Sequence, residues 1–208
     1  MGYYPIFLEL QGRRCLVVGG GRVAERKVEK LIEAGAEVTV ISPAVSNRLR
    51  AWVEAEKICH KARAYEFGDL APFQLAFVAT DDAAVNASVK LEGEERGIWV
   101  NVADDPAHCD FILPSVLQRG ELVVAVASGG SSPALSRAIR EELENYFTED
   151  YATLSEIVAE VRREIKEQGL SAGPEIWRAA LNGGGLRKLV RQGDIEGAKR
   201  YLRERVSV

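Results

Sequence analysis

The chain has 208 residues, enough for one full-sized domain and an appendage, and its 27 basic and 31 acidic side chains give a net charge of −4. This mildly acidic balance argues against general binding to nucleic acid or to anionic membrane surfaces. A hydrophobic fraction of 47% excludes a chain that is disordered throughout, so we expect a globular protein with neither nucleic acid nor a membrane as partner.

Cysteine usage and the first residues of the chain indicate a reducing compartment. The three cysteines, Cys15, Cys59 and Cys109, are odd in number and form no C-x-x-C pair, so a disulfide framework is not expected. No apolar run reaches the ~18 residues that span a bilayer. The first residues lack the basic region of a signal peptide. We therefore expect a cytoplasmic protein.

The first half of the chain alternates buried strands with amphipathic helices. Strands that are apolar on both faces and are joined by helices indicate a parallel sheet covered on both sides, which is an α/β fold. The predicted strands are residues 14–19, 37–41, 75–80 and 98–102, with a weak one at 62–65, and the predicted helices are residues 23–34, 47–56 and 82–96.

The pattern changes after residue 110. Residues 111–117 and 122–127 read as two strands joined by a polar turn at 118–121, which is a hairpin, and a helix with an apolar stripe follows at 134–147. From residue 151 only helical patterns remain. We expect a domain at 1–110, a segment at 111–150 whose uncovered apolar faces make a homodimer, and an all-helical domain at 151–208.

A glycine-rich turn joins the first strand to the first helix. Gly19, Gly21 and Ala24 fit the pattern G-x-G-x-x-A, in which the glycines allow a tight turn and close approach of a pyrophosphate to the helix N-terminus. The strand–turn–helix–strand context predicts a Rossmann-type dinucleotide site, to which we also assign Arg22 and Val23. The alternative is a glycine turn that holds no ligand.

The ends of two other strands supply further candidates for the cofactor site. Ser42, Pro43 and Ala44 stand where an acidic residue usually contacts the ribose, so the choice between NAD and NADP stays open, with NAD expected. Arg48 and Arg50 are either contacts for a 2′-phosphate or solvated helix charges. Thr80 either lines the nicotinamide side or belongs to the cap of the next helix.

Asp104 is the candidate catalytic residue. It follows the strand at 98–102, and ligands of open α/β sheets bind in the crevice outside the carboxyl ends of the strands. A carboxylate at that position is able to accept a proton while a hydride leaves the substrate. The alternative is that Asp104 is only a turn former, since aspartate is common in turns.

A second loop is a candidate for binding an anionic substrate. Ser128, Gly129 and Gly130 expose backbone N–H groups ahead of a helix N-terminus, and Arg137 follows on that helix. The alternative is a capped helix start. The pairs Cys59–His60 and His108–Cys109 lack zinc-site spacing, so no metal site is expected.

Several segments together resemble the precorrin-2 dehydrogenase family, the N-terminal type of siroheme synthase. They are residues 4–7, 15–27, 79–86, 101–106 and 126–133. The resemblance implies oxidation of precorrin-2 to sirohydrochlorin with NAD, a dimerisation segment with swapped elements, and a catalytic aspartate at the place of Asp104. It also leaves open a bifunctional enzyme that inserts Fe²⁺ into the product.

A nucleotide-sensing Rossmann module, such as that of potassium channels, is the alternative from another class. It predicts an acidic residue at the end of the second strand, and it predicts no hairpin followed by a Ser/Gly loop. The sequence shows the reverse on both points.

Overall fold

The computed structural model describes residues 2–182 and 184–206, which fall into two compact units, one up to Leu113 and one from Pro114. Each unit is described by itself. Their boundary lies three residues after the end that the sequence suggested for the first domain.

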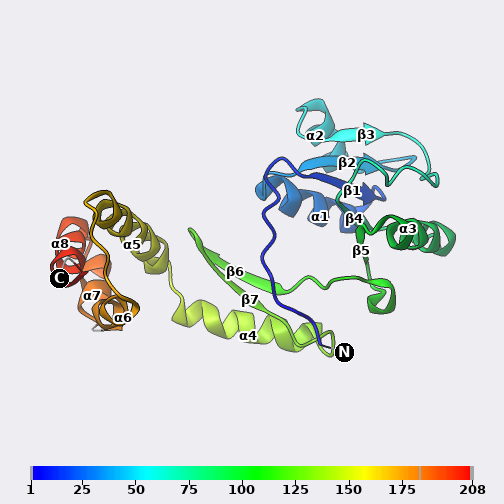
Figure 1. The fold of residues 1–208 in the computed structure, drawn as a ribbon. Helices are drawn as coiled ribbons and strands as arrows, with labels where there is room; N and C mark the ends of the chain where they lie inside the picture. Colours follow the sequence, from blue (N-terminus) through cyan, green and yellow to red (C-terminus); the bar gives the residue numbers. More distant parts are fainter. Residues whose placement is uncertain (1, 183, 207–208) are drawn as a thin grey trace. The chain divides into compact units, whose positions relative to one another are not determined.

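The first unit is built on a five-stranded parallel sheet with the order β3-β2-β1-β4-β5 (Figure 1). The chain moves outward from β1 to β3 and then returns to β4 on the other side of β1, so the direction of winding reverses between β1 and β4. The strands are β1 (Arg14–Val18), β2 (Glu37–Ile41), β3 (Cys59–Lys61), β4 (Leu75–Val78) and β5 (Trp99–Val102).

Helices cover both faces of this sheet, because successive side chains of each strand point to opposite faces. Cys15 and Val17 pack with α1 on one face, whereas Leu16 and Val18 pack with α3 on the other. This confirms the doubly covered α/β sheet that the strand patterns predicted. The helices are α1 (Arg22–Glu33), α2 (Asn47–Glu54) and α3 (Ala83–Arg96), and a short 3₁₀ turn, η1 (Pro106–His108), follows β5.

The weak strand expected at residues 62–65 was wrong. The edge strand β3 lies at Cys59–Lys61 and pairs with β2, with His60 opposite Val40. Its polar residues suit an edge strand and hide it from an apolar pattern. Tyr65 is buried instead in the cluster on the α3 face, and its hydroxyl donates to Glu92.

The second unit begins with an antiparallel hairpin, β6 (Ser115–Arg119) and β7 (Leu122–Val126), followed by α4 (Pro133–Tyr146). The hairpin was predicted, but the first strand expected at 111–117 was misplaced by about four residues. Phe111 belongs to the first unit, where its ring packs edge-on against Phe77 with 5.6 Å between ring centroids. The turn is correspondingly short, with Gly120 at φ +57°.

Helices make up the remainder of the second unit, as the sequence predicted. Their apolar faces form one core cluster that includes Ile157, Val161, Leu186 and Leu202. None of the described helices is long and apolar enough to cross a membrane. The helices are α5 (Asp150–Glu167), α6 (Pro174–Asn182), α7 (Gly185–Arg191) and α8 (Ile195–Val206).

Candidate functional site

Four of the predicted site residues lie along one edge of the sheet. Gly19, Ser42, Thr80 and Asp104 come within two residues of the carboxyl ends of β1, β2, β4 and β5. Because all these strands are parallel, their carboxyl ends meet at the same edge. Gly19 and Thr80 flank the point where the winding reverses, which is where open α/β sheets bind their ligands.

The glycine turn is shaped by close backbone packing. Gly19 has φ +117°, and a Cβ on it would lie 2.2 Å from the carbonyl oxygen of Ala79. A Cβ on Gly20 would lie 2.0 Å from the carbonyl oxygen of Ala44. Gly20 was not among the predicted residues, since the packing of the 42–46 loop on this turn is tertiary information.

Gly21 differs from its two neighbours, because no atom lies within 4 Å of the position its Cβ would occupy. Its backbone is extended and it stands at the N-cap of α1, where no side chain of the described residues makes a capping hydrogen bond. By contrast, Ser46, Asp82 and Ser132 cap α2, α3 and α4.

The start of α1 therefore has open space and uncapped N–H groups in its first turn. The main-chain ladder begins with the hydrogen bond from Glu25 N to Gly21 O, so the amides of Arg22, Val23 and Ala24 have no helical partner. These groups suit a pyrophosphate, which the positive end of the helix dipole also favours. The residues present fit a nicotinamide dinucleotide.

The loop after β2 is held by hydrogen bonds of Ser42. Its hydroxyl donates to the carbonyl of Ala44 at 2.7 Å, and its own carbonyl accepts from Nε2 of His60 at 2.9 Å. Pro43 and Ala44 are exposed on this loop. Arg48 pairs through Nη2 with Glu29 of α1 and its guanidinium stacks over the Trp52 ring, while about half of its side chain is exposed.

Asp104 is exposed and has φ +60°, a left-handed conformation that is uncommon for a residue other than glycine. The neighbouring Asp105 carboxylate contacts Nδ1 of His108 at 2.7 Å. Cys109 holds the other end of the turn, because its thiol contacts the backbone of Val102 and of Asp105. The Asp105 carboxylate is thus engaged with His108, whereas Asp104 is exposed.

For the segment after β4, the sequence left open a contact with the nicotinamide or a cap of the next helix, and the structure shows that Asp82 makes the cap. Asp82 Oδ1 accepts from the amides of Ala84 and Val85, so Asp82 caps α3. Thr80 is half-buried and its hydroxyl accepts from the amide of Asp82. A cofactor contact for Thr80 stays a prediction.

The Ser/Gly loop lies in the second unit, ahead of α4. The Ser128 hydroxyl donates to the carbonyl of Ser132 at 2.8 Å and accepts from its amide at 3.0 Å, so this side chain folds the loop. Gly129 and Gly130 have φ +64° and +83°. Arg137 is 75% exposed and has only a 3.7 Å contact with Glu141, which leaves most of its guanidinium free.

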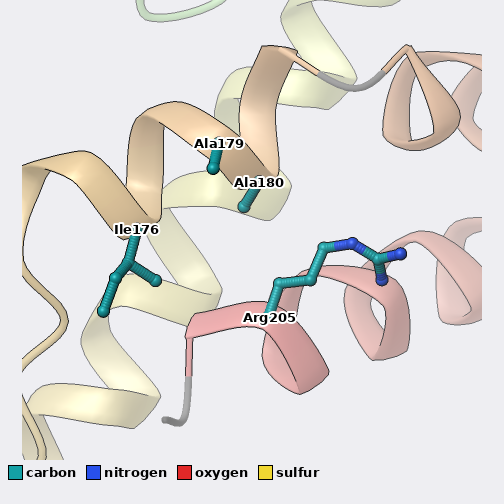
Figure 2. A pocket seen from close by; sticks show the side chains of 4 residues that line it. All are labelled: Ile176, Ala179, Ala180 and Arg205. Carbon is teal, nitrogen blue, oxygen red and sulfur yellow. The ribbon is translucent and has the colours of Figure 1, made fainter.

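A cavity of about 320 Å³ opens in the helical bundle of the second unit, against Ile176, Ala179, Ala180 and Arg205 (Figure 2). The Arg205 guanidinium stacks over the Tyr201 ring at 3.5 Å, so its charge is already partnered. No predicted site residue lines this cavity. Within the described residues, no three His, Cys, Asp or Glu side chains gather in a way that could hold a metal ion.

The chain was compared with protein families and with known proteins. Residues 6–115 match the family described as putative NAD(P)-binding, and residues 119–146 match the central part of sirohaem biosynthesis proteins. The siroheme synthase of Nitrosococcus oceani is 42% identical over 185 residues, which is 88% of this chain and 40% of that protein.

Two further relatives extend over nearly the whole chain. The siroheme synthase of Methylococcus capsulatus is 39% identical over 210 residues, 98% of this chain and 43% of that protein. The chain thus spans less than half the length of these curated relatives. A solved structure described as SirC, precorrin-2 dehydrogenase, is 29% identical with a TM-score of 0.79, and it covers 95% of this chain and 99% of its own.

The first unit combines a parallel sheet, a glycine turn at the reversal of winding and an uncapped helix N-terminus, and the family match covers the same stretch. That match takes in more than half of the chain. The chain belongs to the putative NAD(P)-binding family, and it is a homologue of the siroheme synthases.

Proposed function

We propose that this chain oxidises precorrin-2 to sirohydrochlorin with NAD as the hydride acceptor. The observation that carries the proposal is Asp104, an exposed carboxylate held in a left-handed turn at the carboxyl end of β5. It lies in a chain that a precorrin-2 dehydrogenase structure matches over 95% of its length. The names of the siroheme synthase relatives support the same pathway chemistry.

The reaction removes a hydride and a proton from the tetrapyrrole. When bound, the nicotinamide ring accepts the hydride. The chain's own groups bind the pyrophosphate at Gly21, Arg22 and Val23, where open space meets uncapped amides. Asp104 accepts the proton as a general base.

NAD rather than NADP is favoured by the loop after β2. Arg48, the first of the two candidate cations for a 2′-phosphate, is already paired with Glu29 and stacked on Trp52. Ser42, Pro43 and Ala44 form a neutral edge for the ribose, in place of the usual acidic residue. Thr80 completes this proposed cofactor site.

The substrate carries several carboxylates, and the loop of Ser128, Gly129 and Gly130 with Arg137 is proposed to bind them. The Ser128 hydroxyl folds the loop, which supports a role in shaping the site. The free guanidinium of Arg137 supports a direct role, because arginine binds carboxylates through paired hydrogen bonds.

The test is an anaerobic incubation of the chain with precorrin-2 and either NAD or NADP. The expected result is a shift of the tetrapyrrole absorbance that is matched by NADH formation, with much slower turnover in NADP. No turnover with either cofactor would contradict the proposal. Addition of Fe²⁺ after the oxidation tests the iron insertion that the family resemblance also implies.

We also propose that the chain acts as a homodimer. The α4 residues Leu135 and Tyr146 are 52% and 60% exposed, and Val116 on β6 is 49% exposed. Apolar side chains concentrated on a hairpin and its following helix are typical of an interaction surface.

Sedimentation equilibrium at micromolar concentration checks this proposal, with a dimer expected. Leu135→Arg should weaken the dimer, because it places a charge on the apolar face of α4. Leu181→Arg, at an exposed leucine of α6, is the matched control and should leave the mass unchanged. A monomeric wild-type chain would exclude the homodimer.

A further inference from the structure

Lys27 is a lysine within the buried stripe of α1. The stripe consists of Ala24, Val28 and Leu31, all buried, and Lys27 has the helical spacing that places it among them. Its ammonium lies 5.7 Å from the centre of the Phe77 ring, and its burial lowers its pKa. Burial of a lysine is costly unless the charge is partnered, so its contacts indicate what it does.

Its partner is Asn101 of β5, which is only 6% exposed on the otherwise apolar α1 face of the sheet. Lys27 Nζ donates to Asn101 Oδ1 at 3.1 Å, and Asn101 Nδ2 donates to the carbonyl of Phe111 at 3.0 Å. Asn101 and Phe111 stand just before and just after the turn that carries Asp104. Asn101 therefore joins both ends of that turn, and Lys27 holds the amide of Asn101.

Charge links the same groups. Burial lowers the pKa of Lys27, and Arg26 on the same helix adds to this, whereas Cys109 and Asp104, on the turn after β5, raise it. A left-handed non-glycine residue persists only where the surrounding structure holds it in place, and the fastening through Asn101 supplies that restraint.

We propose that Lys27 is a positioning residue: its ammonium orients the Asn101 amide, which joins the two ends of the turn that carries Asp104. The inference rests on the proposed function for the role of Asp104, but the fixing of the turn is measurable without any substrate. The contact between Lys27 and Asn101 joins helix α1, which is proposed to bind the dinucleotide, to β5, the strand that precedes Asp104.

The first experiment measures the turn itself. In a Cys59→Ser background, the rate at which a soluble disulfide reagent labels Cys109 is compared between wild type and Lys27→Met. Cys15 is fully buried and Cys59 is the exposed cysteine, so the signal reports on Cys109. Loss of the fastening should accelerate labelling at least about tenfold. Unchanged labelling would overturn the proposal.

The second experiment measures the effect of the turn on turnover. Lys27→Met should lower kcat while the KM for precorrin-2 changes little, because the turn that carries Asp104 is then held less firmly. Lys27→Arg should restore much of the lost kcat, because it keeps a donor for Asn101 Oδ1. A wild-type kcat in Lys27→Met would overturn the proposal. Lys27→Leu gives the same test if Lys27→Met does not fold, because it also removes the donor.

The control is Lys30→Met on the exposed side of the same helix, where the side chain is 76% exposed and pairs with Glu33. Labelling and kcat should match wild type. NAD affinity, measured by calorimetry, should change little in Lys27→Met. If the wild-type chain oxidises no precorrin-2 while Lys27→Met exposes Cys109, the proposed function fails and the positioning of the turn stands.

Discussion

Asp104 combines an unusual backbone conformation with an exposed carboxylate. Its φ of +60° lies in the left-handed region, which aspartate and asparagine tolerate better than other side chains that carry a Cβ. A change from Asp104 to asparagine therefore keeps the shape of the turn while it removes the basic oxygen. This makes the substitution a clean test of proton transfer.

Asp104→Asn should lower kcat by about 10²–10⁴-fold, which is the usual cost of losing a general base. That range corresponds to roughly 3–5 kcal/mol of barrier at 1.36 kcal/mol per decade. NAD affinity and thermal stability should remain near wild type, and steady-state kinetics with calorimetry checks all three. Asp105→Asn is the control and should cost far less, because the Asp105 carboxylate contacts His108. Near wild-type turnover in Asp104→Asn would assign the base elsewhere.

Gly21 differs from Gly19 and Gly20 because there is open space around the position that its Cβ would occupy. Gly21→Asp should weaken NAD binding at least about tenfold without unfolding the chain, because the carboxylate enters open space beside the helix N-terminus and repels the pyrophosphate. Titration calorimetry measures the affinity. Gly173→Asp, at another uncrowded glycine in the second unit, is the control. Unchanged NAD affinity in Gly21→Asp would remove the turn from the cofactor site.

At the scale of elements, strands that follow an apolar pattern were predictable, and strands set by tertiary context were not. β3 (Cys59–Lys61) forms by pairing with β2, and its residues show no apolar strand pattern in the sequence. Phe111 has the pattern of a strand residue, but its ring belongs to the first unit. A local sequence pattern does not contain either of these partners.

The candidate site follows the same division. The position of Gly19, Ser42, Thr80 and Asp104 at one edge was predictable, because a parallel sheet brings the ends of its strands together. Gly20 and Lys27 depend on which loop and which strand pack against them. A lysine at the buried spacing of α1 was the one sequence signal that pointed to Lys27.

The Ser/Gly loop and α4 form the element proposed to bind the substrate. Arg137→Ala should raise the KM for precorrin-2 about tenfold, at the low end of a charge-assisted hydrogen bond because the site is exposed. Ser128→Ala should raise it as well, through loss of the loop's two internal hydrogen bonds. NAD affinity should not change in either variant. Arg140→Ala is the control, since Arg140 is already paired with Glu141 and Glu144. A fall in NAD affinity with unchanged KM would assign the loop to the cofactor.

At the scale of the whole molecule, each unit contains a carboxylate whose pKa is lowered to about 2 and whose ionisation supports folding. In the first unit, hydrogen bonds from Arg63 lower the pKa of Asp69 to about 2. In the second unit, burial raises the pKa of Asp150, but hydrogen bonds from Arg187, Thr148 and Arg191 outweigh burial and lower it to about 2. Asp150 begins α5, and both arginines belong to α7, so the pair ties two helices together.

Acid should therefore unfold both units over the same range of pH. A carboxylate with a lowered folded-state pKa stabilises the protein above its unfolded pKa, near 4, and this contribution is lost as the pH falls through about 2. Each group contributes on the order of 2 kcal/mol at neutral pH, since both side chains are largely buried, with 9% and 11% exposed.

Asp150→Asn should thus lower the free energy of unfolding at pH 7, and its difference from wild type should shrink toward zero as the pH approaches 2. Urea unfolding followed by circular dichroism at a series of pH values measures this difference. Asp81→Asn, at an exposed aspartate, is the control and should follow wild type at every pH. If the deficit of Asp150→Asn were the same at pH 7 and near pH 2, the stabilisation would come from the shape of the side chain, and the ionic contacts with Arg187 and Arg191 would contribute nothing.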